Sequence, residues 1–196
     1  ALLDSGARYD TAVVHGSPGR RFSADYSIRS QLIGRDAFWM AAKYGEVEIF
    51  KILLAEGADP FSTDGGGVTT LQVAMGNSGS SLDWRRDRIG NEALDLEDEE
   101  RRTLELTRLL IDAGVDVNAK DDRGRAAIHH AVLKDFPKVV EYLALRGADI
   151  HMPNDRGLTP FALADTEQGM PGTNGLRGTR PEVAELLRRL GADASE

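Results

Sequence analysis

Apolar residues recur along much of this 196-residue chain at the spacing that places them on one face of a short helix. The segment from Glu46 to Glu56 shows the pattern well, and its predicted buried face consists of Val47, Ile49, Phe50, Leu53 and Leu54. Such segments end in a glycine followed two positions later by aspartate, at Gly57, Gly114, Gly147 and Gly191. Because glycine adopts the left-handed conformation at little cost, we predict that it closes each helix.

Shorter apolar segments lie ahead of these helices and predict a first helix for each. They begin near Asp36, Thr69, Ala126 and Gly157. Asp36 can accept hydrogen bonds from the free N–H groups of a helix start, and Pro160 suits a first helical position. The last segment, Pro181–Leu190, predicts a closing helix with a polar outer face.

The landmarks repeat at a fixed distance. Gly124 and Gly157 lie 33 positions apart, as do Gly114 and Gly147. A period of about 33 residues with this content is typical of ankyrin repeats. The segment Gly157–Ala164 resembles the family motif Thr-Pro-Leu-His-x-Ala-Ala most closely, and Ala126–His129 stands in the same slot without the Thr-Pro pair.

This resemblance implies an all-α fold: an ankyrin-repeat solenoid of stacked helix-turn-helix units with β-hairpin-like fingers. We expect a single array over 1–196. Its predicted parts are the tail of a truncated repeat (1–7), four repeats (34–63, 64–120, 121–153 and 154–196) and three inserts (8–33, 77–100 and 165–180). The first insert is typical either of a packed surface loop or of an enlarged binding finger.

The two ends of the chain give further expectations. The helix-tail pattern of Ala1–Ala7 predicts that the natural protein extends upstream, and the polar closing helix predicts a natural C-terminus near Glu196. The long inserts and the Leu-Leu-Arg-Arg-Leu-Gly-Ala ending resemble bacterial ankyrin proteins, some of which are exported. We therefore expect a bacterial source and a cytoplasmic or exported, periplasmic location.

Composition narrows the classes of function. The net charge of −8 disfavours a nucleic-acid backbone as partner. The absence of cysteine excludes disulfides and thiolate nucleophiles, and no apolar run approaches the roughly 20 residues of a membrane span. We expect a monomer without a cofactor.

Several motifs suggest chemistry but support it poorly. The triple glycine at 65–67 is not followed by the Lys-Ser/Thr pair of a phosphate loop. The acidic cluster at 95–100 lacks the spacing of a calcium loop, so we expect a solvated helix start that extends the helix carrying Leu104 to Leu110. Neighbouring His129 and His130 diverge by about 100° on a helix, which disfavours a shared metal. In the family the first of these histidines usually forms a hydrogen bond to backbone in a neighbouring finger.

The resemblance implies a protein-binding function. Ankyrin proteins mostly bind other proteins through the concave side, which carries the fingers and first helices. Carried over by position, the candidate partner-binding residues are Arg35, Lys43, Tyr44, Arg123, Arg125, Lys134, Arg156 and Leu158. Several are cationic, which predicts a locally basic strip and a partner that is acidic or of mixed charge.

Other functions stay open at this stage. The array could be a targeting or regulatory domain of a larger enzyme or signalling protein. It could be an enzyme in its own right, with a pocket formed by the inserts around His15, His129 or Asp135. It could bind a small ligand or a metal through the inserts. We expect a non-catalytic interaction module, since no nucleophile elbow accompanies these histidines.

Overall fold

The structure, a computed structural model, describes residues 6, 8–12, 35–63, 67–76, 96–165 and 179–192. These residues form helices joined by turns, and one isolated antiparallel bridge links Thr63 to Thr69. The helices are α1 (Ala37–Tyr44), α2 (Val47–Ala55), α3 (Thr70–Ala74), α4 (Leu96–Asp112), α5 (Ala127–Leu133), α6 (Pro137–Leu145), α7 (Pro160–Asp165) and α8 (Pro181–Arg189). The all-α fold is as predicted.

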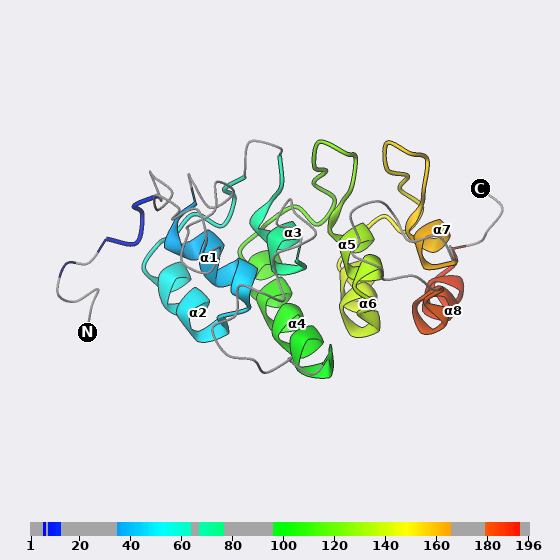
Figure 1. Ribbon diagram of the computed structural model, residues 1–196, viewed down its shortest axis with the longest axis horizontal. Coiled ribbons are helices and arrows are strands. Elements are labelled where there is room, and N and C mark those ends of the chain that lie inside the picture. The colour runs from blue at the N-terminus through cyan, green and yellow to red at the C-terminus, as the bar shows by residue number, and fades with distance from the viewer. Residues whose placement is uncertain are drawn as a thin grey trace, which may run out of the picture.

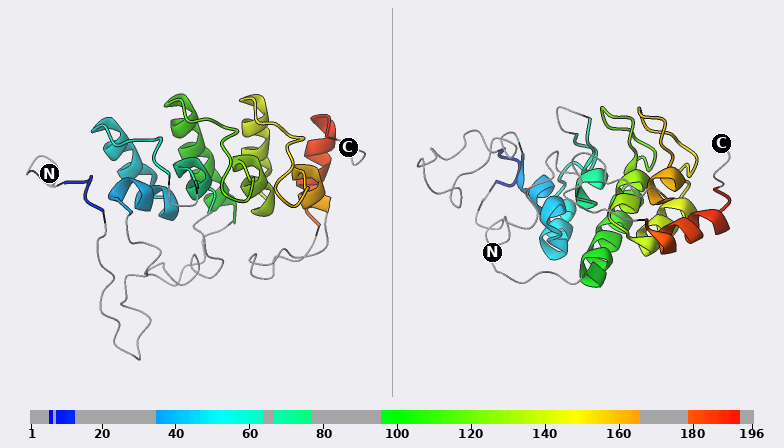
Figure 2. Two further views of the ribbon diagram at one scale, coloured as in Figure 1. Left: turned by 90° about the horizontal axis from the view of Figure 1, so that it is seen from above. Right: turned by 45° about the vertical axis from the view of Figure 1, so that its right-hand side comes forward.

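The helices form four pairs that stand side by side in a row (Figure 1). The first helices of the pairs make one layer, in which α1 contacts α3, α3 contacts α5 and α5 contacts α7. The second helices make the other layer, in which α2 contacts α4, α4 contacts α6 and α6 contacts α8. Figure 2 shows both layers from above. Each pair therefore packs only on its neighbours, as in a solenoid.

The helix ends follow the local signals in the sequence. The Asp36 carboxylate accepts a 2.8 Å hydrogen bond from the backbone N–H of Trp39, and Gly45 ends α1 with φ of 68°. Thr69 and Gln72 form a capping box at α3, and Pro160 is the first residue of α7. These contacts satisfy backbone groups that a helix end leaves unpaired. The predicted roles of Asp36 and Pro160 are confirmed.

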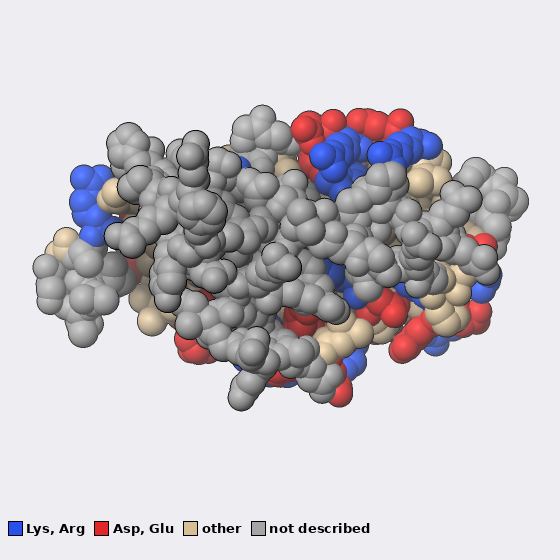
Figure 3. Space-filling view, viewed as in Figure 1, with Lys and Arg blue, Asp and Glu red and all other residues tan. Residues whose placement is uncertain are grey.

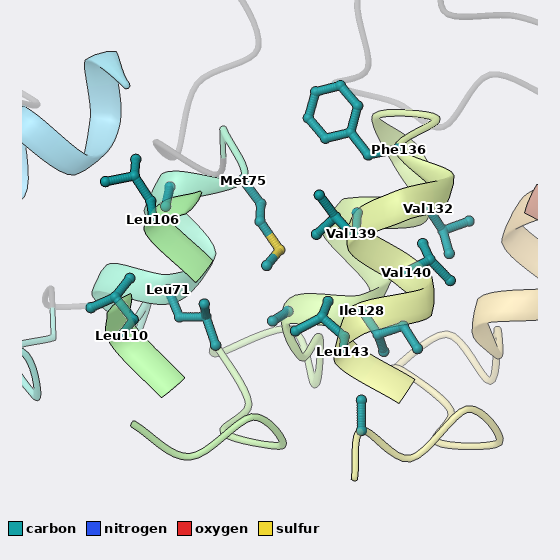
Figure 4. Close-up of a cluster of buried hydrophobic side chains, with 14 of the residues drawn as sticks. Leu71, Met75, Leu106, Leu110, Ile128, Val132, Phe136, Val139, Val140 and Leu143 are labelled. Atoms are coloured by element: carbon teal, nitrogen blue, oxygen red, sulfur yellow. The ribbon is translucent and has the colours of Figure 1, made fainter. Parts of the chain in front are cut away.

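The core lies between successive pairs. Its largest fully buried side chains in the middle of the row include Leu71, Met75, Leu106, Leu110, Ile128 and Leu143. Figure 4 shows Met75 and Leu71 directed from α3 toward the α5–α6 pair. Each fully buried side chain of this size contributes roughly 1.5–3 kcal/mol to the free energy of unfolding. Stability therefore depends on contacts between repeats more than on any one repeat.

One predicted core residue of α2 differs. Phe50 and Leu53 are buried as predicted, but Ile49 is 51% exposed. The described residues leave this side chain accessible to solvent. Helical periodicity identified an apolar position without revealing whether a neighbour covers it.

The acidic segment before Leu104 is only partly a solvated helix start. It does lengthen α4, which begins at Leu96 and has Glu97, Asp98 and Glu99 in its first turn. However, Glu100 is 6% exposed, and its carboxylate accepts a 2.6 Å hydrogen bond from the backbone N–H of Lys138 at the start of α6. The extra turns of α4 lie against the next pair, so this carboxylate caps a neighbouring helix.

The long inserts lie largely outside the described residues. This applies to residues 13–34, 77–95 and 166–178, so the choice between a packed loop and a binding finger in the first insert stays a prediction. Among the helices that the structure describes, none is both long and apolar enough to cross a membrane.

Candidate protein-binding surface

Two finger loops precede α5 and α7 and share one local structure. The Asp121 carboxylate accepts 2.9 Å hydrogen bonds from the backbone N–H groups of Arg123 and Arg125. In the next finger the Asn154 side-chain oxygen accepts from Arg156 and Leu158 at 2.9 and 3.1 Å. A short side chain that bonds the backbone two residues on favours such a turn. The two tips therefore present equivalent residues in equivalent positions.

The tips carry the same sequence, Asp-Arg-Gly. Asp122 and Arg123 in one finger and Asp155 and Arg156 in the other are exposed. In Figure 3 the upper rim, formed by these two fingers, shows Lys and Arg atoms beside Asp and Glu atoms. The two tips are thus of mixed charge, because each exposed arginine follows an exposed aspartate, and the wider basic strip stays a prediction.

The two fingers touch each other. The backbone N–H of Asp155 donates a 3.1 Å hydrogen bond to the carbonyl of Arg123. Gly124 lies so close that a Cβ there would stand 2.4 Å from an Asp155 carboxylate oxygen, and its φ of 69° also favours glycine. The spacing between the exposed arginines is therefore fixed by the backbone.

The first repeat supplies a separate cluster of cations and aromatics. The guanidinium of Arg35 lies over the ring of buried Trp39, 4.8 Å from its centroid. The ammonium of Lys43 is 5.6 Å from the Trp39 ring and 5.6 Å from the Tyr44 ring. Attraction between cation and ring holds these side chains together. The candidates Arg35, Lys43 and Tyr44 are thus brought together, each half-buried.

Three other candidates serve the fold. The Arg125 guanidinium pairs with the buried Asp121 carboxylate at 2.8 Å, and the Lys134 ammonium pairs with Glu99 at 2.9 Å. Each of these two basic side chains is only 15% exposed. Leu158 packs partly against the core. A partner that bound these three side chains would have to displace their contacts within the chain. The four-residue spacing of Asp121 and Arg125 was a local signal for their pairing.

His129 connects its helix to the next finger, as the resemblance implied. It is fully buried, its Nδ1 accepts from the Ala126 N–H at 3.1 Å, and its Nε2 donates to the Met152 carbonyl at 3.0 Å. Burial lowers the pKa of His129, although both backbone contacts oppose that shift. With both ring nitrogens engaged, this histidine has a structural role and is inaccessible to a substrate.

His130 forms a buried charged cluster with Asp121 and Arg125. Its Nε2 lies 3.6 Å from the Asp121 carboxylate, and burial lowers the pKa of His130 to about 4 against the opposing effect of Asp121. Burial alone would raise the pKa of Asp121, but the His130 ring and the backbone and guanidinium of Arg125 hold it well below its usual range. The cluster lies in the interior, where the Asp121 carboxylate links the finger backbone to Arg125 and His130.

The described residues contain no group of three or more His, Asp or Glu side chains arranged to hold a metal ion. Asp135 lies in the turn between α5 and α6 with φ of 58°. His15 lies outside the described residues.

Comparisons with known proteins identify the class. Residues 100–164 match the family described as "Ankyrin repeats (many copies)", and residues 34–65 match the family described as "Ankyrin repeat". These matches include the two fingers and the helix pairs α1–α2 and α5–α6. The chain contains ankyrin repeats, and its fold is the all-α ankyrin solenoid that the 33-residue period predicted.

Relatives with matching segments come from animals and viruses. Human neurogenic locus notch homolog protein 1 is 32% identical over 143 residues, which are 67% of this chain and 6% of that protein. An ankyrin repeat protein of Acanthamoeba polyphaga mimivirus is 39% identical over 61 residues, or 31% of this chain and 8% of that protein. Human protein phosphatase 1 regulatory subunit 27 is 34% identical over 64 residues, or 33% of this chain and 42% of the subunit.

In each of these relatives the chain spans less than half of the relative's own length. The likeness therefore concerns the repeats and not the whole proteins. These relatives give no support to the bacterial source that the inserts suggested.

Proposed function

We propose that this array is a non-catalytic module that binds another protein through its fingers and the adjoining first helices. The observation that carries the proposal is the pair of exposed arginines, Arg123 and Arg156, on two fingers joined by a backbone hydrogen bond. Within the described residues, neither guanidinium makes a hydrogen bond or an ion pair. Arginine is also among the residues that most often dominate binding energy at interfaces.

The charge of the tips indicates the chemistry of the partner. Each arginine follows an aspartate, so a partner segment with carboxylates facing Arg123 and Arg156 and basic or neutral groups facing Asp122 and Asp155 would match both fingers. Complementary charges of this kind raise the association rate and select among partners more than they raise affinity. The half-buried cluster of Arg35, Lys43 and Tyr44 extends the proposed surface to the first repeat.

Affinity capture from the source organism, followed by mass spectrometry, tests this proposal. The baits are the full chain, the double variant Arg123→Ala/Arg156→Ala, and the control Arg108→Ala/Arg189→Ala. The control removes the same charge from exposed positions on α4 and α8. A protein retained by the chain and by the control but lost from the finger variant supports the proposal. Equal retention by all three baits contradicts it.

A second candidate is a targeting or regulatory domain of a larger protein. It is favoured by the relatives, since one is a regulatory subunit by name and the matched segments are 6% and 8% of two much longer proteins. Sequencing the transcript or gene that encodes this chain tests it. An adjoining catalytic or signalling domain in the same reading frame supports this candidate, and a reading frame limited to ankyrin repeats opposes it.

A further inference from the structure

The four second helices can be compared at equivalent positions, counted back from the glycine that closes each. Eight residues before that glycine stand Ile49, Leu106, Val139 and Val183. The last three are fully buried, whereas Ile49 is 51% exposed. Five residues before the glycine, Ile52 is 54% exposed, whereas Leu109 and Tyr142 are partly buried and Leu186 is 5% exposed. The first repeat therefore keeps apolar residues at these positions but covers them less than the later repeats do.

The first helices show the same difference. Ala37 is exposed, whereas Thr70 and Ala127, which stand at the equivalent position of α3 and α5, are 0% and 1% exposed. Met40 is partly buried, whereas the equivalent Val73 is fully buried. We name the four residues Ala37, Met40, Ile49 and Ile52 the N-terminal flank.

The difference has a physical cause in the order of packing. Each later pair lies against a preceding pair, through contacts of α3 with α1, α4 with α2, and so on along the row. The N-terminal flank belongs to the pair that has no described pair before it. Its residues thus have the composition of an inter-repeat contact and the exposure of a surface.

Residues 8–12 include Tyr9, which lies against the end of α2, as a residue that follows a preceding repeat would do. The Tyr9 hydroxyl donates a 2.6 Å hydrogen bond to the carbonyl of Glu56, beside the glycine that closes α2. Tyr9 follows Gly6 by three positions, and the Gly6 φ of 82° resembles the 92° of Gly57 and of Gly114.

Contacts similar to that of Tyr9 join the later repeats, although their residues follow the closing glycine by one position more. The Phe61 ring lies 3.9 Å from the position that a Cβ on Gly114 would take, and Phe61 follows its own closing glycine by four residues. The Asn118 side chain donates a 2.9 Å hydrogen bond to the carbonyl of Gly147, and Asn118 also follows its closing glycine by four residues. Phe61 and Asn118 each follow one repeat and contact the end of the next repeat's second helix. Tyr9 makes a similar contact with the end of α2.

We infer that the N-terminal flank is a stacking surface that receives a further ankyrin-type helix pair, joined to the array through Gly6. The apolar side chains of Ile49 and Ile52 fit the apolar second helix of such a pair, and the small side chain of Ala37 permits a close approach of its first helix. The Tyr9 contact fixes where the incoming pair would connect. This inference does not depend on the proposed binding function of the fingers.

A chimera tests the inference. It consists of a copy of residues 121–147, which hold one complete finger and the α5–α6 pair, followed by residues 7–196, so that Gly147 of the copy takes the place of Gly6. We expect its Tm to exceed that of the chain by about 5 °C or more, because a covered flank adds apolar burial. Hydrogen exchange at the amides of α1 and α2 should slow at least tenfold.

The double variant Ile49→Asp/Ile52→Asp makes the test specific. It should remove the gain in Tm in the chimera while changing the Tm of the chain by less than about 2 °C, since the side chains are exposed there. Leu145→Asp, at a residue that is 75% exposed on α6, is the matched control and should change neither protein. No gain in the chimera, or equal loss in both proteins, would overturn the inference. Sedimentation equilibrium adds a third outcome: dimers of the chain that Ile49→Asp/Ile52→Asp abolishes would assign the flank to a second copy instead.

Discussion

The two ends of the row present opposite chemistry on the same architecture. At the first pair, Ile49 and Ile52 leave apolar side chains half exposed. At the last pair, Arg188 stands three residues before the closing glycine, where the earlier second helices have partly buried Leu54, Ile111 and Ala144. Its guanidinium lies over the Phe161 ring at 5.0 Å and near Glu185 at 3.5 Å. Long basic side chains can cover apolar surface while the charge stays in water.

The comparison shows that a few side chains distinguish an apolar helix face from a charged, solvent-exposed one. Both ends use a helix pair closed by a glycine, and their buried inner positions are alike, with Leu53 in α2 and Leu187 in α8. What differs is the exposed side chains, which are apolar at Ile49 and Ile52 on α2 and charged at Glu185 and Arg188 on α8. A few side chains thus distinguish the two ends of the described row without altering the fold.

The largest change in the free energy of unfolding should come from truncating a buried second-helix residue, in comparison with the exposed residue at the equivalent position of α2. Leu106→Ala should lower the free energy of unfolding by roughly 2–5 kcal/mol, because it opens a cavity at a fully buried position. Ile49→Ala at the equivalent exposed position should cost less than about 1 kcal/mol. Urea titration followed by circular dichroism measures both. Similar losses in the two variants would mean that the N-terminal flank is covered in solution.

A smaller change in the free energy of unfolding should follow from a change of pH, through the buried His130 of α5. His130 is buried where the end repeats have Met40 and Leu163, and its pKa is lowered to about 4 from 6.5. Between these values the unfolded chain binds a proton at His130 and the folded chain does not, so the free energy of unfolding falls as the pH falls. The loss should be about 3 kcal/mol.

His130→Leu imitates the last repeat and should flatten this pH dependence, as measured by urea titration at several pH values between 4 and 7. The exposed His151 provides the control, since His151→Ala should preserve the slope of the chain. A slope that survives in His130→Leu would assign the pH dependence to another group, such as buried His129.

A third effect concerns a contact that only the interior of the row can make. Glu100→Ala should lower the free energy of unfolding by about 1–2 kcal/mol, because the backbone N–H of Lys138 then loses its buried acceptor. Glu97→Ala, at a carboxylate that is 77% exposed, should cost less than about 0.5 kcal/mol. Thermal unfolding of the two variants side by side measures the difference, and equal Tm values would argue against the cap.

The smallest effect is expected at the charged end. Arg188→Leu gives the last pair the residue that Leu54 supplies in the first, and it should change the free energy of unfolding by no more than about 0.5 kcal/mol, because the ion pairs of Arg188 are on the surface. Chemical denaturation checks this value. A loss above roughly 1.5 kcal/mol would show that Arg188 packs on Phe161 more than its exposure suggests.

Sequence reasoning succeeded where the cause is local. Asp36 and Pro160 act within one or two turns of their own helix, so residue type and spacing were enough to predict them. The period of 33 residues predicted the stacking, because repeats of one length pack in one way. His129 and its bond to the next finger followed from the family resemblance.

The failures share a different cause. The partners of Glu100 and Lys134 are separated from them by 38 and 35 positions, so their contacts depend on how far α4 extends beside α5 and α6. The exposure of Ile49 depends on whether a neighbour is present, which its own helix cannot indicate.

The contact between Gly124 and Asp155 has a consequence for the speed and selectivity of recognition. Since the two finger backbones are joined, the arginines at their tips are separated by a fixed interval before any partner arrives. Little conformational entropy of the finger backbones would be lost on binding, because they are already joined. A ligand whose acidic groups are wrongly spaced would gain only one of the two contacts. The fingers would then select a partner by the spacing of its acidic groups as well as by the sign of their charge.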